Sequence, residues 1–182
     1  MTSIDLRWAA VAAGAAATYA MVLEQALMEF EPTPTAHIGL LLTVPPVGAL
    51  FATDLLTRRL PRAISYGGLL VALPWLILSP HTHGGFWNPV QGMAAMTGVA
   101  FFMRWISRGS LGWGDVHFAP LLGAVLGWFS PSTVFSSWLV ASFSCGLLAV
   151  LFIASGGNAR SRLPFGPFLV VGICSAILFA GA

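Results

Sequence analysis

Two aspartates stand at the ends of apolar segments of the chain, where a carboxyl group could do chemistry. Asp54 follows the apolar run 37–53, and Asp115 precedes the apolar run 116–129. Two carboxyl groups at the same depth of a helix bundle can meet, and at short range they share one proton because both cannot ionise cheaply. Such a pair can activate water for peptide hydrolysis, one group acting as base and the other as acid.

Each aspartate also has a simpler explanation. Asp115 is a good N-cap for the helix that follows it, and Asp54 could pair with Arg58 one turn farther on. The glycines just before Asp115, Gly112 and Gly114, favour the catalytic interpretation. Because glycine lets another backbone approach closely, these positions would admit an extended substrate beside the carboxyl group. We therefore expect Gly112 and Gly114 to belong to the substrate-binding site.

The composition indicates the environment in which these residues work. Of the 182 residues, 57% are hydrophobic and only 8% are charged, and the mean hydropathy is +0.85. A soluble domain has about 25% charged residues, so this chain cannot cover itself with polar surface, and the lipid bilayer is the partner that fits. Residues 1–182 suit a single membrane-embedded domain. The net charge of +2 gives no reason to expect a nucleic-acid partner.

Apolar runs long enough to approach or cross a bilayer divide the chain into segments. They predict an all-α, polytopic membrane bundle of about seven transmembrane helices, with bounds near 6–28, 37–53, 64–79, 88–106, 116–129, 133–155 and 167–180.

The arginines predict the orientation of this bundle. All eight cationic residues are arginines. They fall at the start of the first helix, in alternate connections or, for Arg104, in the last turn before such a connection, whereas the loops 29–36, 79–86 and 130–132 contain none. Positive residues accumulate on the cytoplasmic side, so the N-terminus is expected in the cytoplasm. Arg7 and the alanine-rich run after it also resemble a signal peptide, but the apolar run continues to Met28.

The remaining polar residues of the apolar segments have no catalytic role in this interpretation. Glu24 lies near the outer end of the first helix, where it could reach the interface or face a polar partner on another helix. The histidines other than His117 are expected at the outer interface; they are His37, His81 and His83. Neither histidine nor cysteine spacing matches a metal site, so no metal and no cofactor is expected.

Three motifs of the chain resemble those of the type IV prepilin peptidases. Residues 112–117 read Gly-Trp-Gly-Asp-Val-His and precede Leu-Leu-Gly-Ala-Val-Leu-Gly-Trp at 121–128. Asp54 stands seven residues before Pro61, as in the family's first aspartate motif, and Leu-Pro-Phe-Gly-Pro-Phe at 163–168 is similar to its third landmark. The resemblance covers about residues 51–182.

This resemblance implies an intramembrane aspartic endopeptidase of the cytoplasmic (inner) membrane, with Asp54 and Asp115 as the catalytic pair. Its substrate would be a prepilin or pseudopilin whose leader is cut at the cytoplasmic boundary. His117 stands where the family usually has lysine, so the charge beside the site would depend on pH; we group His117 with the substrate-binding residues. The chain lacks the cysteine-containing insertion associated with N-methylation, so the resemblance supports the peptidase alone.

Two other functions remain open at the level of sequence. Intramembrane carboxylates also serve proton relays, so the chain could be a small proton-coupled transporter or an ion-pathway subunit. It could also be a non-catalytic homologue that assists pilus assembly. The shared boundary of Asp54 and Asp115 disfavours the first, and the presence of both aspartates disfavours the second, although His117 favours it mildly.

Overall fold

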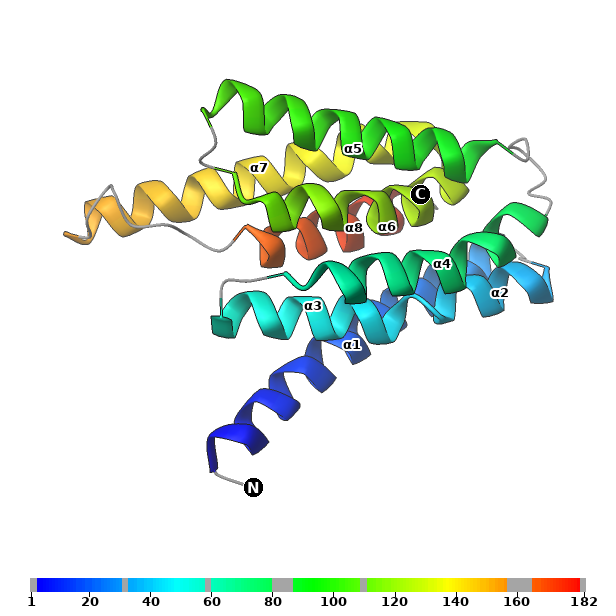
Figure 1. The fold of residues 1–182 in the computed structure, drawn as a ribbon, viewed down its shortest axis with the longest axis horizontal. Coiled ribbons are helices and arrows are strands. Elements are labelled where there is room, and N and C mark those ends of the chain that lie inside the picture. Colours follow the sequence, from blue (N-terminus) through cyan, green and yellow to red (C-terminus); the bar gives the residue numbers. More distant parts are fainter. Residues whose placement is uncertain are drawn as a thin grey trace.

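The computed structural model describes residues 3–30, 33–57, 60–79, 87–108, 111–156 and 165–180, and all regular structure in these ranges is helical. The helices are α1 (Ser3–Phe30), α2 (Pro34–Leu41), α3 (Val44–Thr57), α4 (Arg62–Leu78), α5 (Asn88–Ile106), α6 (Trp113–Phe129), α7 (Pro131–Ala154) and α8 (Gly166–Ala180). The fold is thus an all-α membrane bundle, as the sequence predicts (Figure 1).

The second predicted helix is divided into two. A turn at Leu42 and Thr43 separates α2 from α3, and the two lie roughly in line (Figure 1). Pro45 and Pro46 explain the break, because neither has an N–H to donate to a carbonyl one turn earlier. Residues Pro34–Leu55 still form one apolar stretch long enough to cross a membrane, as do Ala10–Met28 and Pro131–Ala154 among the described residues.

The helix bounds differ from the predicted ones where they matter most. Helix α3 continues to Thr57, so Asp54 lies in its last turns and does not follow its end. Helix α6 begins at Trp113 with Gly112 as its N-cap, so Asp115 lies in the first turn. The alternative interpretation, in which Asp115 only caps this helix, is therefore wrong, because the helix begins two residues before it.

Helix α6 is the central element of the bundle and packs against α4, α5, α7 and α8. Its contact with α5 is close because glycines face each other: a Cβ on Gly127 would lie 2.8 Å from the Cα of Gly92. A Cβ on Gly92 would overlap the carbonyl oxygen of Gly123. Gly123 and Gly127 are one turn apart on α6, the spacing by which small residues let membrane helices approach closely.

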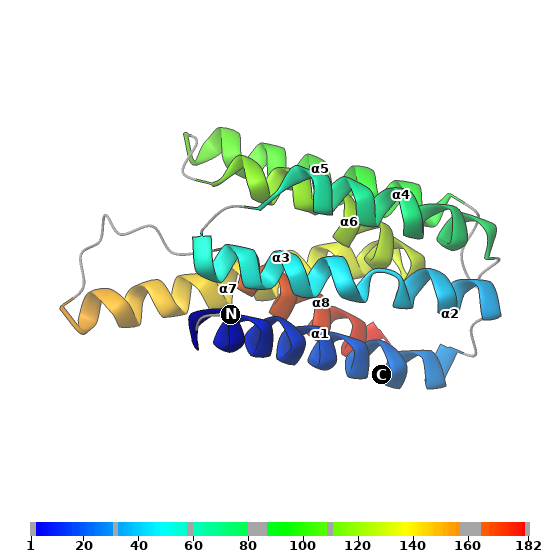
Figure 2. The same ribbon diagram turned by 60° about the horizontal axis from the view of Figure 1, so that its bottom comes forward.

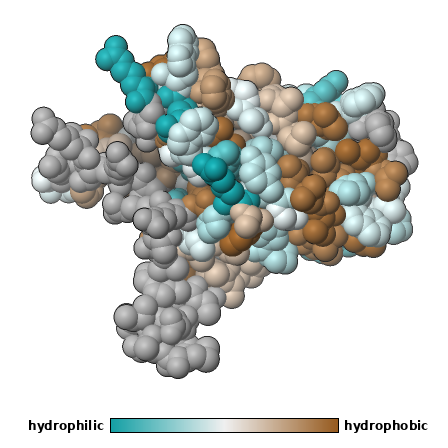
Figure 3. Space-filling model, in the orientation of Figure 1, coloured by the Kyte–Doolittle hydropathy of each residue, from teal (hydrophilic) through white to brown (hydrophobic). Residues whose placement is uncertain are grey.

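The helices run between two ends of the bundle, and the two aspartates lie at one of them. In Figures 1 and 2 the ends of α3, α5 and α7 and the starts of α4, α6 and α8 all lie toward the left. On the face seen in Figure 3, the most hydrophilic side chains lie mainly in the left half, while hydrophobic atoms dominate the right half. Helix α7 extends past the other helices at this left end (Figure 2).

Two hydrogen-bonded groups of buried polar side chains lie inside the bundle. The Tyr19 hydroxyl lies 3.1 Å from Oγ1 of Thr43, which donates to the Leu40 carbonyl at 2.6 Å. Trp128 Nε1 donates to Ser79 Oγ at 3.1 Å. Such bonds are required where neither lipid nor a packed core offers water to a polar group.

Glu24 and His37 meet at the other end of the bundle. Oε1 of Glu24 lies 3.2 Å from Nε2 of His37, which joins α1 to α2. The sequence allowed a polar partner for Glu24 on another helix, and that partner is His37. His37 itself was expected only to lie at the interface. His81 and His83 lie outside the described residues.

Candidate active site

Asp54 and Asp115 line one pocket of about 530 Å³ at the end of the bundle where α3 ends and α6 begins. Both are buried, with exposed fractions of 5% and 7%. The other residues that line the pocket come from the start of α4 and the turn before Asp115; they are Leu60, Pro61, Arg62, Gly112, Trp113 and Gly114. The structure therefore brings together the two aspartates and the two glycines singled out in the sequence.

Asp54 is held by the start of α8. The backbone N–H of Gly166 donates to Oδ2 of Asp54 at 3.0 Å. Because Gly166 is the first residue of its helix, its N–H has no partner within the helix, and the positive end of the helix dipole faces the carboxylate. A Cβ on Gly166 would lie 2.6 Å from the same oxygen, so only glycine permits this contact.

Phe165, the residue before Gly166, holds the start of α8 in place. The Phe165 ring stacks on Trp138 of α7, with ring centroids 5.6 Å apart and an interplanar angle of 29°. Aromatic pairs of this geometry contribute about 0.5–1.5 kcal/mol beyond the area they bury. Helix α7 thus anchors the start of α8, and α8 in turn orients Asp54.

Asp115 faces the pocket from the first turn of α6. Its Oδ1 is buried and has no hydrogen-bond partner among the described residues. A buried carboxyl oxygen without a partner is costly and is therefore a candidate to bind water, a proton or substrate. Gly112 leaves room beside the other oxygen, because a Cβ there would lie 3.1 Å from Oδ2 of Asp115.

Arg104, near the end of α5, holds the turn that carries Asp115. It donates a hydrogen bond to the carbonyl of Leu111. Its guanidinium carbon also lies 4.3 Å from the centroid of the Trp113 ring, within the range of a cation–π interaction. Both contacts fall on the residues that flank Gly112, so Arg104 restrains the backbone from which Asp115 projects.

The second glycine of the motif has a packing role as well. A Cβ on Gly114 would lie 2.8 Å from the Cβ of Leu60. Gly114 therefore lets the start of α6 approach the segment that links α3 to α4. This contact brings the two sides of the pocket together, because Leu60 and Gly114 both line it.

His117 lies beside the pocket and is not among the residues that line it. Its Nδ1 is 2.8 Å from the Tyr66 hydroxyl of α4. Its ring also stacks on Trp113, with centroids 6.0 Å apart and an interplanar angle of 23°. Since Trp113 does line the pocket, His117 supports one of its walls.

Several expectations concern residues outside the described ranges. Arg58, the alternative partner of Asp54, is one of them, as are Leu163 and Pro164 of the third motif. Of that motif, Phe165 and Gly166 are described, and they contact Trp138 and Asp54.

Sequence reasoning did not assign roles to two residues that the structure brings to the site. Gly166 was part of a motif, but nothing in its spacing placed it against Asp54, 112 residues earlier. Arg104 was used only as an indicator of orientation, and nothing in its sequence position predicted its contacts with Leu111 and Trp113. A signal for Gly166 did exist, since a glycine opens an apolar helix within a short motif.

Comparison with known proteins identifies the family of the chain. No curated protein and no solved structure matches the chain. Residues 41–155 match the Type IV leader peptidase family, and this range includes Asp54, the whole Gly112–His117 motif and the pocket that they form. Since the match covers well over half of the 182 residues, the chain belongs to the Type IV leader peptidase family.

Proposed function

We propose that this membrane peptidase is an aspartic endopeptidase in which Asp54 and Asp115 act together on the peptide bond. One observation carries the proposal: two buried carboxyl groups from helices far apart in sequence line the same pocket at one end of a membrane bundle. Burying two carboxyl groups together is unfavourable, so a fold that does so needs a functional reason.

The chemistry follows from one proton shared by two carboxyl groups. The ionised carboxylate removes a proton from a water molecule, whose oxygen attacks the carbonyl carbon of the scissile bond. The protonated carboxyl donates its proton to the carbonyl oxygen, which gives a tetrahedral diol. Transfer of a proton to the amide nitrogen then breaks the carbon–nitrogen bond and releases acid and amine.

The substrate class in this proposal is a prepilin or pseudopilin with a short basic leader followed by an apolar helix. Its scissile bond would lie at the membrane boundary, level with the aspartates. Gly112, Gly114 and His117 are assigned to substrate binding, the first two at the pocket wall and His117 behind Trp113. No metal or cofactor takes part.

The proposal includes a location and a domain organisation. Residues 1–182 form a single peptidase domain that crosses the inner membrane seven times, with α2 and α3 counted as one crossing. The pocket then faces the cytoplasm, where the arginines predict the ends of α3, α5 and α7. A basic leader that stays in the cytoplasm would meet the pocket there.

A transporter or a non-catalytic assembly factor is less well supported. A proton pathway needs ionisable groups at successive depths of the membrane. Asp54 and Asp115 instead lie in one pocket. Glu24 pairs with His37 at the opposite end of the bundle. A non-catalytic homologue has no need of both buried carboxyl groups.

The test is to replace each aspartate. Asp54→Asn and Asp115→Asn should each lower cleavage of a co-expressed prepilin by about 10²–10⁴-fold, the typical contribution of general acid–base catalysis. Because the pair acts as a unit, the double variant should be no slower than either single one. Mobility shift of the prepilin measures cleavage, and detergent size-exclusion profiles check folding. Full cleavage by either single variant rules out the pair.

A further inference from the structure

A second pocket, of about 260 Å³, lies on the outer side of α5 and differs chemically from the aspartate pocket. It is lined by two arginines and three aromatic residues: Phe101, Arg104, Trp105, Arg108 and Trp113. Phe101, Arg104 and Trp105 recur at intervals of three and one residues, so they share one face of the last turns of α5. Arg108 follows the C-cap of this helix. No carboxylate is among the described residues that line it.

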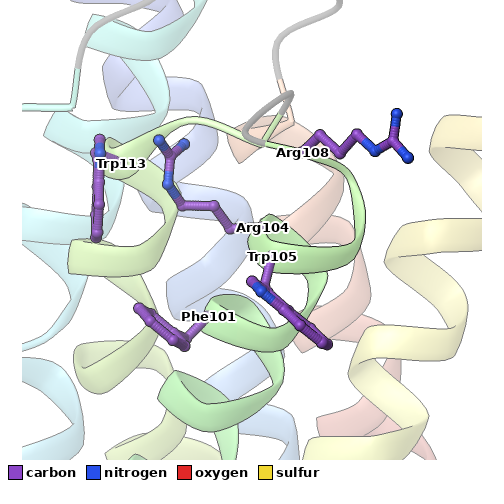
Figure 4. A pocket seen from close by; sticks show the side chains of 5 residues that line it. All are labelled: Phe101, Arg104, Trp105, Arg108 and Trp113. Carbon is purple, nitrogen blue, oxygen red and sulfur yellow. The ribbon is translucent and has the colours of Figure 1, made fainter.

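We propose that this pocket binds the phosphate headgroup of an anionic phospholipid. The chemistry of the lining is the first reason. Guanidinium groups bind phosphate oxygens through paired N–H donors, and Arg104 and Arg108 bring two positive charges to one small pocket. In Figure 4 the Arg104 guanidinium lies beside the Trp113 ring, while the Arg108 side chain extends to the opposite side, away from Trp113.

The aromatic residues are the second reason, because they show where the pocket lies. Trp105 is 72% exposed and Phe101 55% exposed on the outside of the bundle. In a membrane protein such faces contact lipid, and tryptophan favours the level of the headgroups. Figure 4 shows both rings farther back along α5 than the guanidinium groups, so acyl chains would lie along the rings and the phosphate would reach the arginines.

The backbone of Arg108 is the third reason. It adopts a φ of 51°, a left-handed conformation that costs about 1 kcal/mol or more for a residue with a side chain. The C-cap Ser107 precedes it, and glycine or asparagine would suit such a position after a helix better. The chain thus has an arginine at a position where the backbone conformation disfavours any residue with a side chain. This is expected if the arginine side chain binds a ligand.

A soluble anion fits these observations less well than a lipid. A free phosphate would gain nothing from the exposed rings, whereas a lipid uses both the rings and the charges. Basic pockets on the cytoplasmic side of membrane helices are typical sites for anionic headgroups. The leaflet depends on the proposed orientation of the bundle; the binding itself does not depend on the proposed function.

The pocket also adjoins the aspartate pocket, because Trp113 lines both. The Arg104 guanidinium lies over the Trp113 ring, and the His117 ring stacks on the same tryptophan. A headgroup on Arg104 would therefore lie one side chain away from the proposed catalytic pair.

The test measures lipid retention directly, so its failure would leave the peptidase proposal untouched. The full-length protein in detergent is mixed with phosphatidylglycerol or with phosphatidylcholine of the same acyl chains, and bound lipid is counted by native mass spectrometry. We expect one phosphatidylglycerol to be retained in preference to phosphatidylcholine. Arg108→Gln should weaken that binding about fivefold, the effect of one cation near an anionic lipid, and Arg7→Gln, which removes a charge at the start of α1, should not.

A second measurement does not depend on any variant. Phosphatidylglycerol with a photoreactive group on its headgroup should crosslink to the wild-type protein within residues 101–113. Crosslinks confined to other segments, equal retention of both lipids, or equal losses in Arg108→Gln and Arg7→Gln would overturn the proposal. Displacement of the lipid by millimolar inorganic phosphate, or by a short polyglutamate peptide, would overturn it in favour of a soluble anion or an acidic peptide.

Discussion

The backbone N–H of Gly166 lies 3.0 Å from Oδ2 of Asp54, and this hydrogen bond joins residues 112 positions apart. It places the positive end of α8 against one proposed catalytic carboxylate. Three helices therefore build the aspartate pair: α3 carries Asp54, α6 carries Asp115 and α8 orients Asp54.

Gly166→Ala should abolish most cleavage without unfolding the protein. The new Cβ would lie 2.6 Å from Oδ2 of Asp54, so the carboxylate must move. A displacement of about 1 Å in a catalytic group costs about 10²-fold in rate. Cleavage of a prepilin by purified protein measures the effect. Gly146→Ala in α7 is the matched control, because a Cβ there would meet nothing within 4 Å; equal rates in the two variants would contradict the prediction.

Gly92→Ala should lower stability through the contact of α5 with α6. The added methyl would overlap the backbone of α6, and such overpacking costs about 1–3 kcal/mol. Thermal unfolding in detergent should show a lower midpoint. Gly98→Ala lies in the same helix with open space around its Cβ, so its midpoint should not fall. If both variants unfold at the same temperature, the close approach of these helices contributes nothing.

Arg104→Gln should slow cleavage about tenfold while leaving both aspartates in place. The arginine donates to the Leu111 carbonyl and contacts Trp113, and a charged hydrogen bond contributes about 1.5–3 kcal/mol. Without these contacts the turn before Asp115 is held less firmly. Arg104→Lys retains the charge but not the planar fork, so it should recover only part of the rate. A Gln variant as fast as wild type would show that the turn needs no such support.

The proposed topology predicts on which side of the membrane a fused reporter will lie. With seven crossings and a cytoplasmic N-terminus, a phosphatase reporter fused after Ala182 should be active, because it lies outside the cytoplasm. The same reporter inserted between residues 157 and 164, after α7, should be inactive. An inactive fusion at Ala182 with normal expression would contradict either the number of crossings or the orientation.

Much of this fold could be predicted from the chain because the bilayer acts as a uniform solvent. Apolar runs must become helices there, since every backbone N–H and carbonyl needs a partner, and the bounds predicted for α5 are the observed ones. The break between α2 and α3 was not predicted, although Pro45 and Pro46 give its physical cause. The candidate pair, Asp54 and Asp115, was also visible, because a carboxyl group beside an apolar run is rare enough to be noticed.

The sequence by itself determined the helical membrane fold and singled out Asp54 and Asp115 as candidates, since both inferences follow from local composition and motif. The tertiary structure alone decided that Gly166 donates to Asp54, that Arg104 restrains the turn before Asp115, and that His117 stands behind Trp113 and does not line the pocket. These relations join helices far apart in the chain. Their distances depend on how closely the backbones pack, and packing is set by the side chains of all the helices together.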